Sequence, residues 1–80
     1  METALLGTSE VCARIGISTR QLEYWVLIGV IEPMTERHGA KIHRKFSEDD
    51  LWMLRKVKKL TDEGFLVSRA AEKVKRAMRG

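Results

Sequence analysis

The chain has 80 residues, 44% of them hydrophobic and 32% charged, with a net charge of +4. This length supports one domain with one core, spanning residues 1–80, and the composition is that of a folded domain. Because no apolar run approaches the roughly 20 residues that cross a bilayer, and the first residues lack the pattern of a signal peptide, we expect a cytoplasmic protein that binds no membrane.

The first predicted element is a short helix that begins at Thr8 or Ser9 and ends at Gly16. One buried face is formed by three apolar residues at helical spacing, Val11, Cys12 and Ile15. A lone cysteine at such a position is expected to be a small packing residue, with no disulfide or zinc site.

A second helix is predicted to follow after a very tight turn. Ser18, with Gln21 three residues later, matches the S-x-x-Q capping box, and Gly29 can adopt the left-handed conformation that ends a helix. Its apolar stripe consists of Leu22, Trp25 and Val26. Residues 8–29 therefore form a predicted helix-turn-helix.

Helical periodicity disappears over residues 30–46, where a two-stranded β wing is predicted. We expect a turn at His38 and Gly39. Alternation would place Ile42, Arg44 and Phe46 on one face of the second strand. Lys41, His43 and Lys45 would lie on the opposite face, and we expect this more basic face to meet a partner.

Two further helices are predicted in residues 47–79. Ser47 caps the third helix, which has an apolar stripe of Leu51, Leu54, Val57 and Leu60 and ends at Gly64. Ser68 is expected to cap the fourth, whose apolar residues are Ala70, Ala71, Val74 and Met78. The predicted fold class is thus mainly α: a winged helix-turn-helix of four helices, with the wing between the second and third.

A helix-turn-helix places the exposed N-terminal end of its second helix in the major groove of DNA. Four residues there are candidate contacts: Ser18, Thr19, Arg20 and Tyr24. Arg20 is the best candidate for a base contact, because arginine donates two hydrogen bonds to guanine. The alternative is an ordinary exposed arginine in a first helical turn.

Cationic residues concentrate in the second part of the chain. Residues 1–33 have a net charge of −2, whereas residues 34–80 carry 13 basic and 7 acidic side chains. The wing contributes four candidate phosphate contacts: Lys41, His43, Arg44 and Lys45. This distribution favours double-stranded DNA as the partner, with a solvated basic surface as the alternative.

The order of these features resembles the DNA-binding domain of the MerR family of transcriptional regulators and its excisionase-like relatives. The matching segments are TSEVCARIGI (8–17), STRQLEYWVLIGVI (18–31) with Pro33, HRKFSEDDL (43–51) and Glu63-Gly64-Phe65. The resemblance implies a winged-helix core that binds promoter or recombination-site DNA. It implicates Thr19, Arg20, Tyr24 and Arg44 as contacts.

The chain departs from the family pattern at three points. Glu23 stands where such sequences often have a basic residue, so it either accepts a hydrogen bond from a cytosine amino group or the helix docks differently. The wing is longer between Pro33 and His43 than in the compact form. Typical regulators also continue into a dimerising helix and an effector domain. We expect either a fragment of a larger regulator or a small protein that binds DNA as a dimer or cooperative array, or with another regulatory protein.

The rival interpretation is a protein-interaction module, or a phage or recombination architectural factor such as an excisionase or packaging subunit, whose basic surface receives an acidic partner. Trp52 bears on this, being either a half-buried residue at the edge of the core or an exposed contact residue. No enzyme is expected, because no set of catalytic side chains converges. We also expect no metal site and no cofactor, because the consecutive Glu48, Asp49 and Asp50 point in different directions around a helix.

Overall fold

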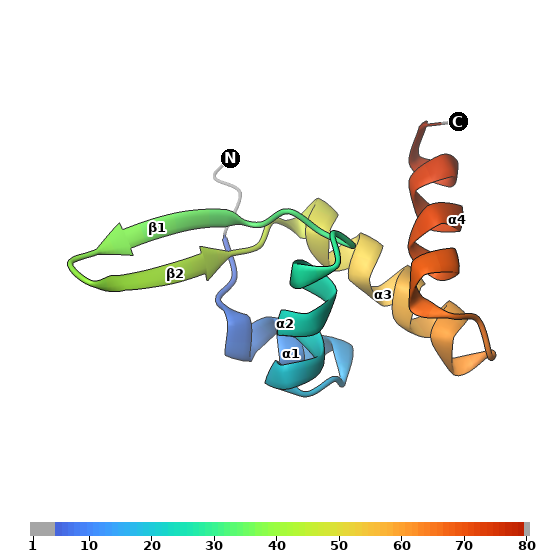
Figure 1. Cartoon of the computed structure of the whole chain (residues 1–80), viewed down its shortest axis with the longest axis horizontal. Helices are drawn as coiled ribbons and strands as arrows, with labels where there is room; N and C mark the ends of the chain where they lie inside the picture. The colour runs from blue at the N-terminus through green and yellow to red at the C-terminus, as the bar shows by residue number, and fades with distance from the viewer. Residues whose placement is uncertain (1–4, 80) are drawn as a thin grey trace.

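The computed structural model describes residues 5–79, and the elements in this range are four helices with one β-hairpin between the second and the third (Figure 1). Their bounds are α1 Thr8–Ile15, α2 Thr19–Leu27, β1 Met34–His38, β2 Lys41–Lys45, α3 Glu48–Asp62 and α4 Val67–Arg79. The predicted fold class, a helix-turn-helix with a two-stranded wing, is confirmed.

Serine caps begin α2 and α3, as the sequence predicts. The Ser18 hydroxyl accepts a hydrogen bond from the Gln21 backbone N–H at 3.0 Å. Gln21 does not return a bond within residues 5–79, so this capping box is only half formed. At α3 the box is complete: the Asp50 N–H donates to the Ser47 hydroxyl at 3.1 Å, and the Ser47 N–H donates to the Asp50 carboxylate at 3.0 Å. These bonds satisfy N–H groups that lack a partner inside the helix.

The turn between α1 and α2 depends on Gly16, whose φ of 85° lies in the left-handed region. Its N–H donates to the Cys12 carbonyl at 2.8 Å, and the N–H of Ile17 donates to the same oxygen at 3.2 Å. The chain therefore reverses within three residues. Ile17 is buried beneath the turn, which fixes the start of α2 over the core.

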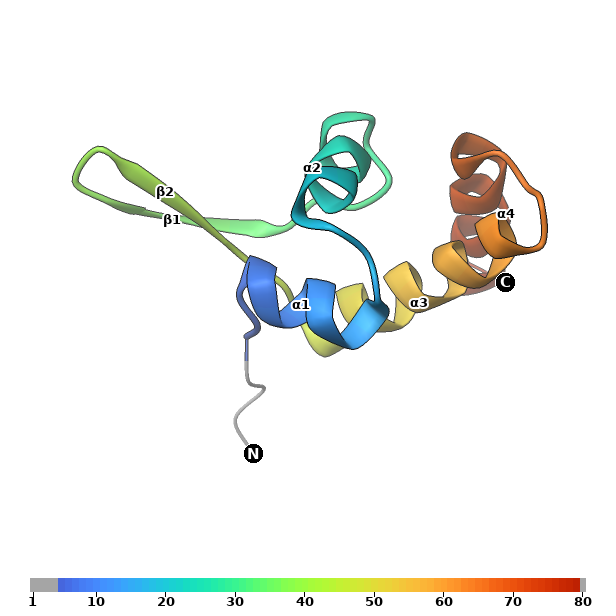
Figure 2. The ribbon, with the colours of Figure 1, turned by 90° about the horizontal axis from the view of Figure 1, so that it is seen from below.

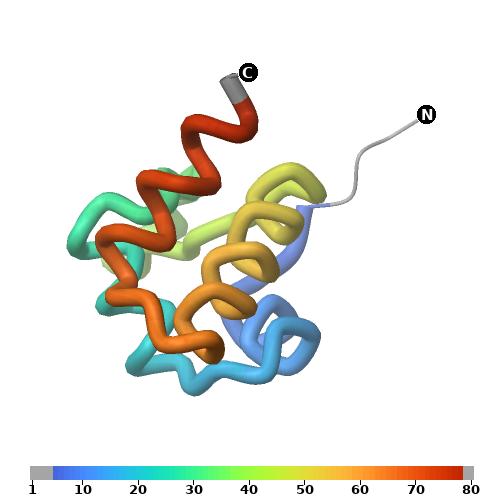
Figure 3. The backbone as a smooth tube through the Cα atoms, turned by 90° about the vertical axis from the view of Figure 1, so that its right-hand side faces the viewer, coloured from blue at the N-terminus to red at the C-terminus, as the bar shows by residue number. Residues whose placement is uncertain are grey.

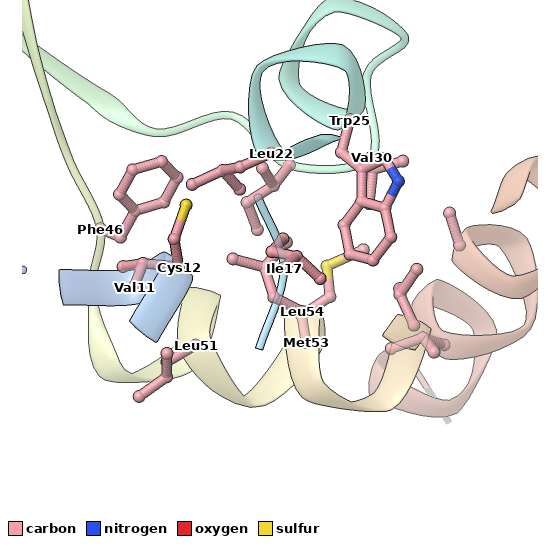
Figure 4. Close-up of a cluster of buried hydrophobic side chains, with 14 of the residues drawn as sticks. Val11, Cys12, Ile17, Leu22, Trp25, Val30, Phe46, Leu51, Met53 and Leu54 are labelled. Atoms are coloured by element: carbon pink, nitrogen blue, oxygen red, sulfur yellow. The ribbon is translucent and has the colours of Figure 1, made fainter. Parts of the chain in front are cut away.

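All four helices contribute side chains to one hydrophobic core, together with Phe46 directly after β2 (Figure 4). α4 packs against α3 (Figure 3). Trp25 and Leu22 enter it from the rear face of α2, and Leu54 and Val57 enter from α3. The expected stripes are largely confirmed, although Ile15, Val26 and Leu60 are only half-buried. Further buried side chains, which the stripes did not include, are Leu6, Ile17, Val30, Ile31 and Met53.

The hairpin extends from this body and is tied to it at one end (Figure 1). Its strands are antiparallel, with Met34 opposite Lys45 and His38 opposite Lys41. Directly after β2, Phe46 is fully buried and forms a two-bond bridge with Leu6, in which each N–H donates to the other carbonyl at 2.8 Å. Most of the hairpin is exposed, so this end anchors it.

Three expectations about single residues were wrong. His38 ends β1 and is not part of the turn, because Gly39 and Ala40 suffice for a two-residue connection. Ser68 lies in the first turn of α4 and does not cap it, because the helix already begins at Val67, which packs against the core. Met78 is 50% exposed, since the end of α4 projects beyond the body of the domain (Figure 1).

Candidate nucleic-acid interface

The outer face of α2 presents the candidate contact residues predicted at its N-terminal end. Ser18, Thr19 and Arg20 are exposed, and Tyr24 is 52% exposed one turn after Arg20. The opposite face is fixed by Leu22 and Trp25, which are 1% and 2% exposed. The orientation of α2 is therefore set by packing, and its polar side chains remain available to a ligand.

Arg20 is the cationic residue at the N-terminal end of α2. It is exposed in the first turn of α2 and forms no ion pair with any residue in the range 5–79. By contrast, Arg14 on α1 is bound to Glu10 at 3.1 Å. The guanidinium of Arg20 thus retains its donors for a partner outside the chain.

α2 and the β-hairpin lie on the same side of the molecule, with α1 and the start of α3 beneath them (Figure 2). Arg44 of β2 connects the two: its Nη1 donates to Oε1 of Glu23 on α2 at 3.3 Å. The Arg44 side chain is 38% exposed and that of Glu23 is 57% exposed. This pair joins two elements that lie on the same side of the molecule (Figure 2).

A cleft of about 450 Å³ lies where the start of α1, the start of α2 and β2 meet. Thr19 lines it together with three of the predicted wing residues, His43, Arg44 and Lys45. Lys41 is placed apart from them, beside the hairpin turn. The structure thus brings together half of the predicted contact residues at this cleft and leaves Lys41 toward the tip of the wing.

The hairpin register assigns the remaining charges to its two faces. The face of Lys41 and His43 also carries Glu36, directly opposite His43, and His38, whose ring lies 5.3 Å from that of His43. In the tautomer with the hydrogen on Nε2, His38 donates a hydrogen bond to Oε2 of Glu36 at 3.2 Å. This carboxylate reduces the positive charge of the face that the sequence favoured.

Arg37 is a further cationic residue on this surface, and sequence analysis did not single it out. It lies opposite Ile42, on the same face as Arg44, and is exposed. The signal was present in the sequence, because a two-residue turn at residues 39 and 40 fixes the pairing of positions 37 and 42.

The described residues contain no cluster of metal-binding side chains and no membrane-spanning helix. Among residues 5–79, no three histidine, cysteine or carboxylate side chains are grouped so as to hold a metal ion. None of the helices in that range is both long and apolar enough to cross a membrane. Cys12 is buried, with its Sγ 4.0 Å from the Thr19 hydroxyl, as expected for a packing residue.

Comparison with known proteins agrees with this geometry. A search among curated proteins found no match. A similar solved structure is a transcriptional regulator of the MerR family from Bacillus cereus, with 22% sequence identity and a TM-score of 0.76. The match covers 89% of this chain but 52% of that one, so this chain spans about half its length. The family model described as MerR HTH family regulatory protein matches residues 7–77. The chain therefore belongs to the MerR HTH family, whose members are DNA-binding regulators of transcription and not enzymes.

Proposed function

We propose that this chain recognises a specific double-stranded DNA sequence, with α2 in the major groove and the β-hairpin along the flanking backbone. The observation that carries this proposal is the placement of the exposed face of α2 and the hairpin on one side of the molecule, joined by Arg44 and Glu23. A ligand approaching that side meets both elements at once.

The roles on α2 follow from side-chain chemistry. Arg20 donates to O6 and N7 of a guanine, a pairing that contributes about 1–3 kcal/mol of discrimination. Ser18 and Thr19, at the positive end of the helix dipole, contact a phosphate, and the Tyr24 hydroxyl contacts backbone or base. Readout therefore rests mainly on Arg20, and its neighbours set the register.

The roles on the hairpin are electrostatic. A strand of five residues is about 17 Å long, which exceeds the roughly 12 Å width of the major groove. The hairpin can therefore reach phosphates beyond the groove that holds α2. The side chains proposed to contact them are Lys41, His43, Arg44 and Lys45, with Arg37 added.

The test is fluorescence anisotropy on a selected duplex and on random duplexes at several salt concentrations. About four cationic contacts give a slope near −4 for the logarithm of affinity against that of salt concentration. Arg20→Ala should remove sequence preference, whereas Lys45→Ala should weaken all duplexes alike and reduce the slope by about one. Lys59→Ala on α3 removes the same charge away from this surface and should change little. Affinity that does not depend on salt would refute the proposal.

We further propose that the chain binds its target together with a second copy or another regulatory protein. A single module of this size buries roughly 600–1,000 Å² on DNA, which is small for a specific site. Two half-sites about one helical turn apart should then be occupied cooperatively. Equal, independent occupation of both half-sites in a footprinting titration would refute cooperation between copies.

A second candidate function, docking of an acidic protein segment, is favoured by a groove between α3 and α4. Three lysines line it, Lys56, Lys59 and Lys73, against one acid, Glu63. The rest of the lining is Trp52, which is 45% exposed, with Leu60, Val74 and Ala77. If this surface acts, an acidic amphipathic peptide should change the fluorescence of Trp52, and Lys73→Ala should weaken this binding while leaving DNA affinity unchanged. Trp25 is buried and serves as a constant background.

A further inference from the structure

We propose that Glu23 is a specificity-determining residue that reads a cytosine, and that Arg44 is the residue that positions it. This inference rests on the proposed function, because it assigns roles within the same DNA-facing surface. It also accounts for a carboxylate on a surface that is otherwise suited to phosphate.

The ion pair between Glu23 and Arg44 differs from the others in the described part of the chain. Three of those pairs join residues four apart on one helix, and the fourth lies within β1. Only the pair of Glu23 and Arg44, separated by 21 residues, links two different elements of residues 5–79. It therefore links the wing to α2, whereas the other pairs link residues within one element.

Electrostatics explain why the pair is needed if α2 lies in the major groove. An isolated carboxylate there would be repelled by the phosphates of both strands. Arg44 neutralises Glu23 through a single bond, from Nη1 to Oε1. The second carboxylate oxygen, Oε2, accepts no hydrogen bond from residues 5–79, and Arg44 keeps its other nitrogens as donors. Both side chains can thus bind DNA without breaking the pair.

The chemistry of the free oxygen selects the base. In the major groove, carboxylates accept from the N4 amino group of cytosine. Guanine presents only acceptors there, and the N6 amino group of adenine lies beside the N7 acceptor, which repels a carboxylate. Glu23 follows Arg20 by three residues, about 4.5 Å along the helix axis, which is close to the 3.4 Å separation of base pairs. The two side chains therefore read neighbouring positions, a guanine at Arg20 and a cytosine at Glu23, while the free donors of Arg44 bind a phosphate.

The experiment measures relative affinities for a selected duplex and for every single-base variant of it. Glu23→Gln keeps the shape of the side chain but replaces the carboxylate with an amide group, and glutamine prefers adenine. At one position, the native chain should favour cytosine by about 5- to 150-fold, the usual cost of a mismatched base pair in a specific site. The variant should lose this preference or transfer it to adenine. Because Glu23 is exposed, the thermal unfolding of the Glu23→Gln variant should match that of the native chain.

Glu72→Gln is the matched control, since Glu72 also pairs with an arginine at 3.0 Å but lies on α4. It changes net charge equally, so any general gain in affinity appears in both variants, whereas the altered base preference appears only in Glu23→Gln. Arg44→Ala should reduce discrimination at that same position, beyond its uniform loss of affinity. Arg44→Lys keeps the charge but not the planar set of donors, so it should restore only part of the base discrimination.

Two outcomes separate this inference from the proposed function. If the native chain prefers one sequence and Glu23→Gln changes affinity without changing any base preference, the role of Glu23 is refuted and DNA recognition stands. If the native chain binds no duplex even at low salt, the proposed function itself fails.

Discussion

Gly16 offers the sharpest test of how the turn positions α2. Its φ is 85°, and a Cβ at this position would lie 3.9 Å from Cε of Lys58, an ordinary contact. Space therefore does not oppose a side chain, and the cost of Gly16→Ala is backbone strain alone, about 1–2 kcal/mol. Alanine also lowers the conformational entropy of the unfolded chain, which offsets part of this cost. The net loss of stability is then about 1 kcal/mol. For a domain of this size, that lowers Tm by about 6 °C.

The assay is thermal unfolding followed by circular dichroism, with Gly16→Asn as the comparison. Asparagine also places a Cβ at this position but tolerates the left-handed region better than alanine does. We expect Gly16→Asn to fall between the native chain and Gly16→Ala. An alanine variant as stable as the native chain, or an asparagine variant less stable than alanine, would refute the argument from strain.

Two further predictions concern the caps and the core. Ser47→Ala removes one half of the complete capping box of α3 and should lower stability by about 1 kcal/mol. Thermal unfolding should show this as a fall in Tm of about 6 °C. An unchanged Tm would show that the cap contributes nothing to stability. Cys12 is 8% exposed, so it should react with a thiol reagent only as fast as the domain opens; labelling at the rate of a free thiol would contradict its packing role.

Local signals in the sequence predicted most of the fold. Ser18 and Ser47 marked helix starts and Gly16 marked a turn, because these features depend on residues within three or four positions of one another. The signals failed where tertiary packing decides. Val67 packs against the core and so starts α4 ahead of Ser68, although serine is the better cap.

The candidate site was predictable as a set of residues but not as an arrangement. Exposure of Arg20 followed from the apolar stripe on the rear of α2. The link between Glu23 and Arg44 could not be foreseen, because it joins residues 21 positions apart, and alternation alone does not tell which hairpin face turns toward α2. The bridge between Leu6 and Phe46 was missed for the same reason.

The central claim is that α2 enters the major groove, and protection of guanine N7 from methylation tests it most directly, because that atom lies in the major groove. Bound protein should protect one guanine in each half-site, and Arg20→Ala should lose that protection at concentrations where the duplex is still occupied. A fully occupied duplex whose guanines all react as in free DNA would contradict the claim.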